Sequence, residues 1–188
     1  MKFAIIGIAI FAGLLLIGGI AGCNTYNSLI TKNEACDEKW AEIDNMLKRR
    51  ADLIPNLVET VKGFAKQEKE VFATVSQARS QLLNAKGVKE KGSAAGSFDS
   101  AISRLLMISE RYPDLKSNQN FLRLQDELAG TENRIAVART RYNEAVKEIN
   151  TAIKRFPGVL VAGMAGASQK EYFEITNPED KETPKVNL

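Results

Sequence analysis

Apolar residues are distributed along this chain in two different ways. Residues 3–23, 21 in all, form an apolar stretch without a charged side chain. In a helix this stretch rises about 30 Å, the thickness of the hydrocarbon core of a bilayer. Beyond residue 35 the apolar residues recur every three or four positions, the period of a helix with one buried face. The pattern therefore predicts a membrane segment followed by amphipathic helices.

The apolar stretch has two interpretations, and both attach the rest of the chain to a membrane. It is either a retained transmembrane helix or a lipoprotein signal, because Ile20-Ala21-Gly22-Cys23 resembles a lipobox whose cysteine would be lipidated. Lysines flank the stretch on both sides, so the charge bias gives no clear orientation. Since a lipobox requires export, we expect the remainder of the chain on the outer, periplasmic or extracellular, side.

Two heptad-like seams follow, and they are typical of long helices that pair in a left-handed coiled coil. The first seam comprises Trp40, Ile43, Leu47, Arg50, Ile54, Leu57, Val61, Phe64, Glu68, Val71, Val75, Ala78, Leu82 and Ala85. The second comprises Phe121, Leu124, Leu128, Thr131, Ile135, Ala138, Tyr142, Ala145, Ile149, Ala152 and Phe156. A shorter run comprises Phe98, Ile102, Leu105, Ser109 and Tyr112. No strand-like alternation of any length occurs, which predicts an all-α fold.

Prolines and glycines mark predicted kinks and a loop in the region of the seams. Pro55 falls inside the first seam without shifting its phase, which predicts one kinked helix over residues 31–86. Residues 87–96 contain three glycines and are predicted to form the internal loop. If Pro113 also only kinks its helix, residues 93–156 run back towards the membrane.

These patterns predict an N-terminal transmembrane helix followed by an elongated antiparallel bundle of long helices. Residues 1–23 would be the anchor, as a transmembrane helix or a lipoprotein signal. Residues 24–173 would form the bundle. Residues 174–188 are polar, contain two prolines and have too few apolar groups to order themselves, so they are predicted to be a disordered tail.

Residues 157–167 are uncharged and too short to span a bilayer. If the outgoing and returning helices are equally long, this segment reaches the membrane surface. There it would enter the lipid interface or cover a second subunit; the alternative is a cap on the bundle. Tyr26 could belong to an interfacial aromatic belt, whereas Trp40, about 25 Å past the stretch along a helix, is predicted to be core. The candidate membrane or partner contacts are Tyr26, Val159, Leu160, Val161 and Met164.

Polar residues interrupt the seams at Arg50, Glu68 and Thr131. Arg50 belongs to a basic cluster that could meet lipid phosphates or an acidic partner. We expect it instead to reach a carboxylate across the bundle, with Asp52 and Glu68 as candidate partners. Glu132 lies beside Thr131 in the second seam. Because polar seam residues commonly specify helix register, we assign that role to these positions, with a small-ligand or ion site as the alternative.

The composition of the chain argues against several classes of function. The 26 basic and 23 acidic residues are nearly balanced along the chain, which argues against an electrostatic nucleic-acid binder. The chain has no histidine, which excludes a histidine-based triad, zinc site or di-iron bundle. No nucleophile or phosphate-binding motif occurs, and no carboxylate pair has an apolar setting that would tune one as an acid. We therefore predict no enzyme activity, catalytic residue, metal or cofactor.

Several longer motifs in the chain carry a resemblance to known proteins. They are YNSL at residues 26–29, LKRRADLIPNLVETVKGFAKQE at 47–68, YPDLKSNQNFLRLQDELAGTENRIAVARTRYNEA at 112–145, FPGVLVAG at 156–163 and EYFE at 171–174. Together these motifs resemble the LemA family of bacterial membrane-anchored helical proteins. The resemblance implies an N-terminal anchor and an antiparallel helical bundle without known catalysis. It carries no ligand residues over to this chain. One branch of the family acts in forming magnetosome membranes, so the resemblance also suggests membrane shaping.

The expected function is that of a non-enzymatic structural or scaffold protein of the bacterial cell membrane, which binds protein partners or itself. Five glycines in the apolar stretch allow transmembrane helices to approach closely, so we expect a homo-oligomer; the sequence names no other protein partner. The alternative is a module that senses a ligand or presents it to another envelope protein.

Overall fold

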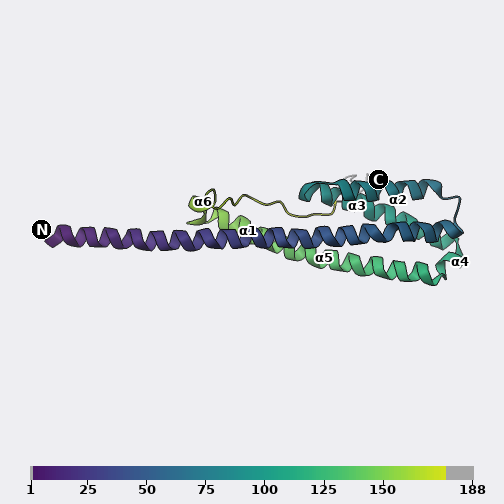
Figure 1. Cartoon of the computed structure of the whole chain (residues 1–188), viewed down its shortest axis with the longest axis horizontal. Coiled ribbons are helices and arrows are strands. Elements are labelled where there is room, and N and C mark those ends of the chain that lie inside the picture. The colour runs from purple at the N-terminus through teal and green to yellow at the C-terminus, as the bar shows by residue number, and fades with distance from the viewer. Residues whose placement is uncertain (1, 177–188) are drawn as a thin grey trace, which may run out of the picture. The chain divides into compact units, whose positions relative to one another are not determined.

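The computed structural model describes residues 2–176, and the described chain contains helices and no strand. Figure 1 shows α1 (Lys2–Phe64), α2 (Lys69–Asn84), α3 (Gly87–Met107), the 3-10 helix η1 (Ile108–Arg111), α4 (Pro113–Lys116), α5 (Gln119–Lys154) and α6 (Gly158–Val161). This confirms the all-α prediction. Most of the tail that was predicted to be disordered lies outside the described residues.

Contacts divide the chain into two units, which we call the stem and the bundle. Among the described residues, the stem comprises 2–39 and 142–170, and the bundle comprises 40–141 and 171–176. Because α1 and α5 each contribute to both units, the units share these two helices.

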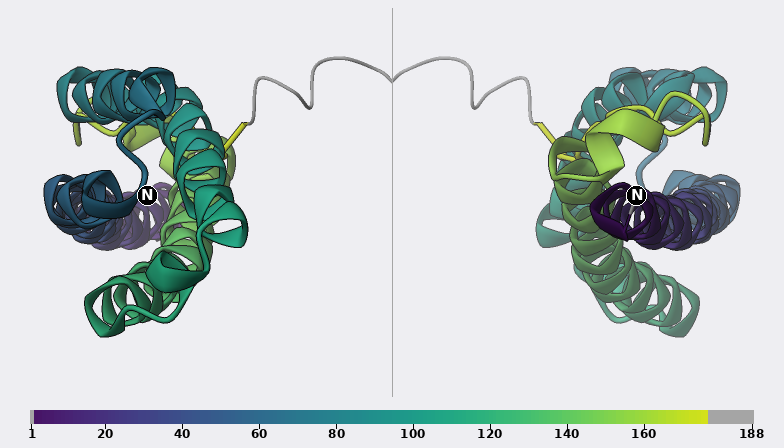
Figure 2. Two further views of the ribbon diagram at one scale, coloured as in Figure 1. Left: turned by 90° about the vertical axis from the view of Figure 1, so that its right-hand side faces the viewer. Right: turned by 90° about the vertical axis from the view of Figure 1, so that its left-hand side faces the viewer.

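The long segments of the bundle come from α1, α2, α3 and α5, and ion pairs give the relative direction of α1 and α5. Glu42 and Arg49 of α1 pair with Arg141 and Glu127 of α5 at 3.7 and 3.3 Å. The partner's number falls as the α1 number rises, so these segments are antiparallel. Helices α2 and α3 pack side by side and are joined only by two residues, Ala85 and Lys86 (Figure 2).

The predicted seams supply most of the buried residues. Buried positions include Ile43, Leu47, Ile54, Leu57, Val61, Val75, Ala78, Leu82, Phe98, Ile102, Leu105, Phe121, Leu128, Ile135, Ala138, Tyr142 and Ile149. The prediction of burial was wrong at two seam positions, because Phe64 is 39% exposed and Phe156 is 80% exposed. Both lie at or just beyond the end of a helix, where the periodic pattern no longer determines a buried face.

The prediction of one helix over residues 31–86 was wrong. Pro55 lies inside α1 as expected, but α1 ends at Phe64 and α2 begins at Lys69 after a short turn. Two helices that pack on the same core both show the heptad period. An unbroken phase therefore does not require an unbroken helix.

The predicted loop at residues 87–96 is also wrong, because it forms the first half of α3. Gly87 has a φ of +73°, which glycine adopts without strain, and the Glu90 carboxylate accepts a hydrogen bond from the Lys86 backbone N–H at 2.9 Å at the start of the helix. Gly92 is buried, and a Cβ there would collide with the backbone carbonyl of Glu174. The glycine thus permits close packing rather than a loop.

Residues 93–156 do not form one returning arm either. After α3 the chain passes through η1 and α4, where Pro113 occupies the first turn. Asn118 then starts α5, because its Oδ1 accepts hydrogen bonds from the N–H groups of Asn120 and Phe121 at 3.0 and 3.1 Å. Pro113 therefore lies in a connection between helices.

Candidate functional site

The apolar part of α1 belongs to the stem. By length and composition, α1 is the one helix among residues 2–176 that could cross a membrane, and little of its apolar window is buried. Its large exposed side chains include Phe11, Leu15, Leu16, Ile17 and Ile20. Such a surface is unfavourable in water and suits the interior of a bilayer.

A short apolar segment, residues 156–167, follows α5 in the stem; we call it the apolar hairpin. It folds back because Gly158 lies so close to α5 that a Cβ would collide with the Ala152 carbonyl. Its backbone is closed by hydrogen bonds from Ala162 N–H to the Gly158 carbonyl at 2.8 Å and from Ala167 N–H to the Ala162 carbonyl at 3.0 Å. The structure therefore holds this segment in a compact turn.

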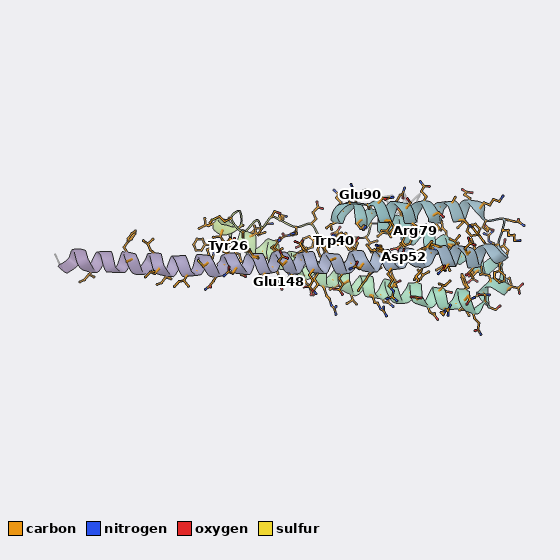
Figure 3. The ribbon with its side chains drawn as sticks, viewed as in Figure 1. Tyr26, Trp40, Asp52, Arg79, Glu90 and Glu148 are labelled. Atoms are coloured by element: carbon orange, nitrogen blue, oxygen red, sulfur yellow. The ribbon has the colours of Figure 1, made fainter. Side chains whose placement is uncertain are left out.

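The apolar hairpin and α1 together line an open groove of about 500 Å³. Its lining consists of Gly19, Gly22, Cys23, Tyr26, Asn27, Val161 and Met164. Figure 3 shows Tyr26 on α1 near the hairpin. Three of the five residues predicted as membrane or partner contacts thus meet here, although the path of equal helical arms used to predict it was wrong. The other two, Val159 and Leu160, are 58% and 67% exposed.

Polar contacts fasten the stem beside this groove. The Asn150 side chain donates to the Lys170 carbonyl and accepts from the Lys170 N–H, both at 2.9 Å, which ties the chain after the hairpin to α5. Lys170 also pairs with Asp37 at 2.8 Å. Lys32 of α1 pairs with Glu148 of α5 at 2.6 Å (Figure 3), and its hydrogen bond lowers the pKa of Glu148.

The two cysteines differ in their surroundings. Cys23 is exposed at the groove, whereas Cys36 is buried, and burial raises the pKa of the Cys36 thiol. A buried thiol with a raised pKa is a weak nucleophile. Lipidation of Cys23 remains a prediction.

A charge cluster around one buried arginine lies in the bundle. Arg50 of α1 is only 7% exposed, and its guanidinium pairs with Asp99 of α3 and with Glu132 of α5. The guanidinium also lies 6.0 Å from the centre of the Phe98 ring. Burial raises the pKa of Asp99 to about 6, although the nearby Arg50 charge opposes this shift. The cluster thus joins three helices through one arginine.

The predicted partners of Arg50 were wrong. Asp52 pairs with Arg79 of α2 at 3.3 Å (Figure 3), and Glu68 pairs with Arg111 at 3.1 Å. The predicted role of Glu132 beside the seam fits its pairing with Arg50, but no pattern in the sequence indicated Asp99, which neighbours the buried Phe98. Burial raises the pKa of Asp99, which lies beside Glu132. The expectation that no carboxylate pair has an apolar setting that shifts a pKa was therefore wrong.

Thr131 and Trp40 occupy the predicted interior with different contacts. Thr131 is buried, and its hydroxyl donates to the Leu128 carbonyl of its own helix at 2.8 Å. Trp40 is half-buried, and its ring meets the edge of Phe173 with a centroid distance of 5.4 Å. Phe173 is fully buried, so the segment after the stem completes the core of the bundle.

Comparison with known proteins agrees with this architecture. The LemA family profile matches residues 39–188. The chain is 26% identical over 200 residues to magnetosome protein MamQ 2 of Paramagnetospirillum magneticum, which covers 93% of this chain and 71% of the relative. It is 28% identical to magnetosome protein MamQ of Magnetospirillum gryphiswaldense, over 79% of this chain and 64% of that protein. Protein LemA of Metamycoplasma hominis is 28% identical over 58% of this chain and 50% of its own length. The protein belongs to the LemA family.

Proposed function

We propose that the protein is a membrane-anchored, non-enzymatic scaffold of the bacterial envelope, with its bundle on the outer side. The observation that carries this proposal is that α1 runs without interruption from exposed apolar residues into the buried seam. One end of this helix suits lipid, and the other end, from Ile43 onwards, supplies a face of the bundle core. A helix of this kind attaches a folded domain to a membrane.

The polar interior also favours a structural role. Its charged residues pair with one another, and Arg50 forms ion pairs with both carboxylates beside it. A buried ion pair of this kind can fix which helices meet and in which register.

The similarity to magnetosome proteins supports a role at membranes, and we include membrane shaping in the proposal. We propose that the protein acts by binding protein partners or further copies of itself. The open groove between α1 and the apolar hairpin favours the second candidate, a module that senses or presents a ligand.

Cross-linking of the full chain in native membranes, followed by affinity capture, tests the scaffold proposal. The expected result is a defined cross-linked oligomer or a reproducible partner that survives extraction in detergent. A monomer with no partner would contradict it. A melting temperature that rises with the concentration of one small ligand would support the second candidate instead.

Sidedness is tested on whole cells whose outer barrier has been opened. A bundle on the outer side is digested by added protease, whereas a cytoplasmic bundle is protected. The Cys23→Ser variant distinguishes the two anchors. If the apolar stretch is a retained helix, the variant stays in the membrane. If a lipid on Cys23 is the anchor, the variant loses its attachment.

A further inference from the structure

We propose that the apolar hairpin and the adjacent Lys154 and Arg155 form a second membrane contact, which enters the lipid interface and binds anionic phospholipid headgroups. This inference rests on the proposed membrane anchor. It adds a specific lipid surface as the partner of the stem.

Exposed apolar side chains are the first support. Phe156, Val159, Leu160 and Met164 are 80%, 58%, 67% and 77% exposed, all within nine residues. Scattered apolar residues on a surface need no explanation, but a contiguous group on one short turn marks an interaction site. Close contact of Gly158 with α5 holds this turn in place before any partner binds.

The depth of the hairpin is the second support. Val161 and Met164 line the same groove as Gly19, Gly22, Cys23 and Tyr26. The apolar stretch ends at Cys23, and Gly19 lies about 6 Å before it along the helix axis. Interfacial apolar elements insert about 5–10 Å into the boundary between headgroups and acyl chains. If α1 spans the membrane, the hairpin is therefore already at the depth of the interface.

The third support is the charge beside the hairpin. Lys154 and Arg155 are exposed, and neither forms an ion pair within residues 2–176. No acidic residue occurs between Glu148 and Glu171, and Glu148 is already paired with Lys32. The hairpin end of the stem thus carries a positive charge that complements anionic lipid.

A second copy of the chain fits this surface less well than lipid does. In a two-fold contact the same patch meets itself. That arrangement would bring the Lys154 and Arg155 pairs of two chains together, and like charges in contact oppose association. An anionic headgroup places opposite charge at the same positions.

The test uses tryptophan fluorescence of the full chain in vesicles that contain brominated phosphatidylcholine, which quenches an indole only on contact with the acyl region. The probe is Leu160→Trp in a Trp40→Phe background, which keeps an aromatic ring against Phe173. The matched control is Val137→Trp in the same background, because Val137 is 50% exposed and lies on α5 in the bundle. Vesicles of phosphatidylcholine alone are compared with vesicles that also contain phosphatidylglycerol.

We expect strong quenching of the Leu160→Trp indole, more with phosphatidylglycerol, and little quenching of the Val137→Trp control. Adding Lys154→Gln and Arg155→Gln should remove the increment due to phosphatidylglycerol. Equal quenching at both sites, or none at the Leu160→Trp site, would overturn the inference. So would a spectral shift that depends on protein density and not on lipid composition, since that outcome indicates a second copy.

Flotation of the same vesicles reports the anchor separately: lost flotation contradicts the proposed function, and retained flotation without quenching contradicts only this inference.

Discussion

The stem and the bundle use apolar residues in opposite ways. In the bundle nearly all large apolar seam residues are buried, and the buried Arg50 has carboxylate partners. In the stem, large apolar residues such as Leu16, Phe156 and Met164 remain mostly exposed. The difference shows that an apolar pattern identifies faces that avoid water, but not whether protein or lipid covers them.

The largest effect that separates the two units is expected from a charge placed in the bundle core. Ile135 is fully buried, so Ile135→Asp should lower the free energy of unfolding by several kcal/mol and unfold the bundle. Helical circular dichroism during denaturation in detergent measures this loss. Arg49→Ala is the control, because Arg49 is exposed and should change stability by about 0.5 kcal/mol or less. Equal losses in both variants would contradict the core assignment.

Breaking the charge cluster around Arg50 should have the next largest effect. Arg50→Met removes the cation and leaves Asp99 and Glu132 without it, which should cost about 3–5 kcal/mol. Adding Asp99→Asn and Glu132→Gln should recover part of this loss, because the two unpaired charges are then removed. Chemical denaturation of the single and triple variants measures the recovery. A triple variant as unstable as Arg50→Met would show that the arginine acts mainly by packing.

Stability should also depend on pH through Asp99. Its pKa is raised from the ordinary 3.8 to about 6 by burial, so the folded protein holds this proton more tightly than the unfolded chain. Between about pH 4 and pH 6 the contribution of Asp99 therefore makes the free energy of unfolding fall as the pH rises, by up to about 3 kcal/mol. Comparing the pH profiles of the native chain and Asp99→Asn isolates this contribution. Parallel profiles would contradict it.

The smallest effect is expected in the stem. Leu160 is 67% exposed, so Leu160→Ser should leave the free energy of unfolding in detergent within about 0.5 kcal/mol of the native value. Thermal unfolding followed by circular dichroism tests this. A loss as large as that of a core variant would mean that the hairpin is a structural part of the fold, and the contrast between the two units would fail.

Helical periodicity explains how much of this structure could be read from the sequence. Burial on a helix repeats with the helical turn, so positions such as Leu57 and Ile135 were identified from spacing alone. The same reasoning placed Pro55 within a helix, since the seam keeps its phase across it. The apolar stretch was equally clear, because its length matches a bilayer.

Contacts between distant segments could not be read in this way. Gly92 looks like a loop residue until the carbonyl of Glu174, far away in the sequence, is found against it. Arg50 had several nearby carboxylates, and one of its two partners, Asp99, became identifiable only once α3 was known to lie beside α1. Asn118 was a readable signal that was missed, since an asparagine before a helical run is a common N-cap.

The contact between Phe173 and Trp40 has a consequence for biosynthesis. Phe173 follows every helix found among residues 2–176, yet it is fully buried in the bundle and meets a residue of α1. The ribosome therefore releases the apolar stretch before the helices α2 to α6, and the closing segment of the bundle after them. A nascent chain that has reached the membrane still lacks the last piece of its core. This late closure leaves the core of the bundle incomplete until the segment around Phe173 has been synthesised.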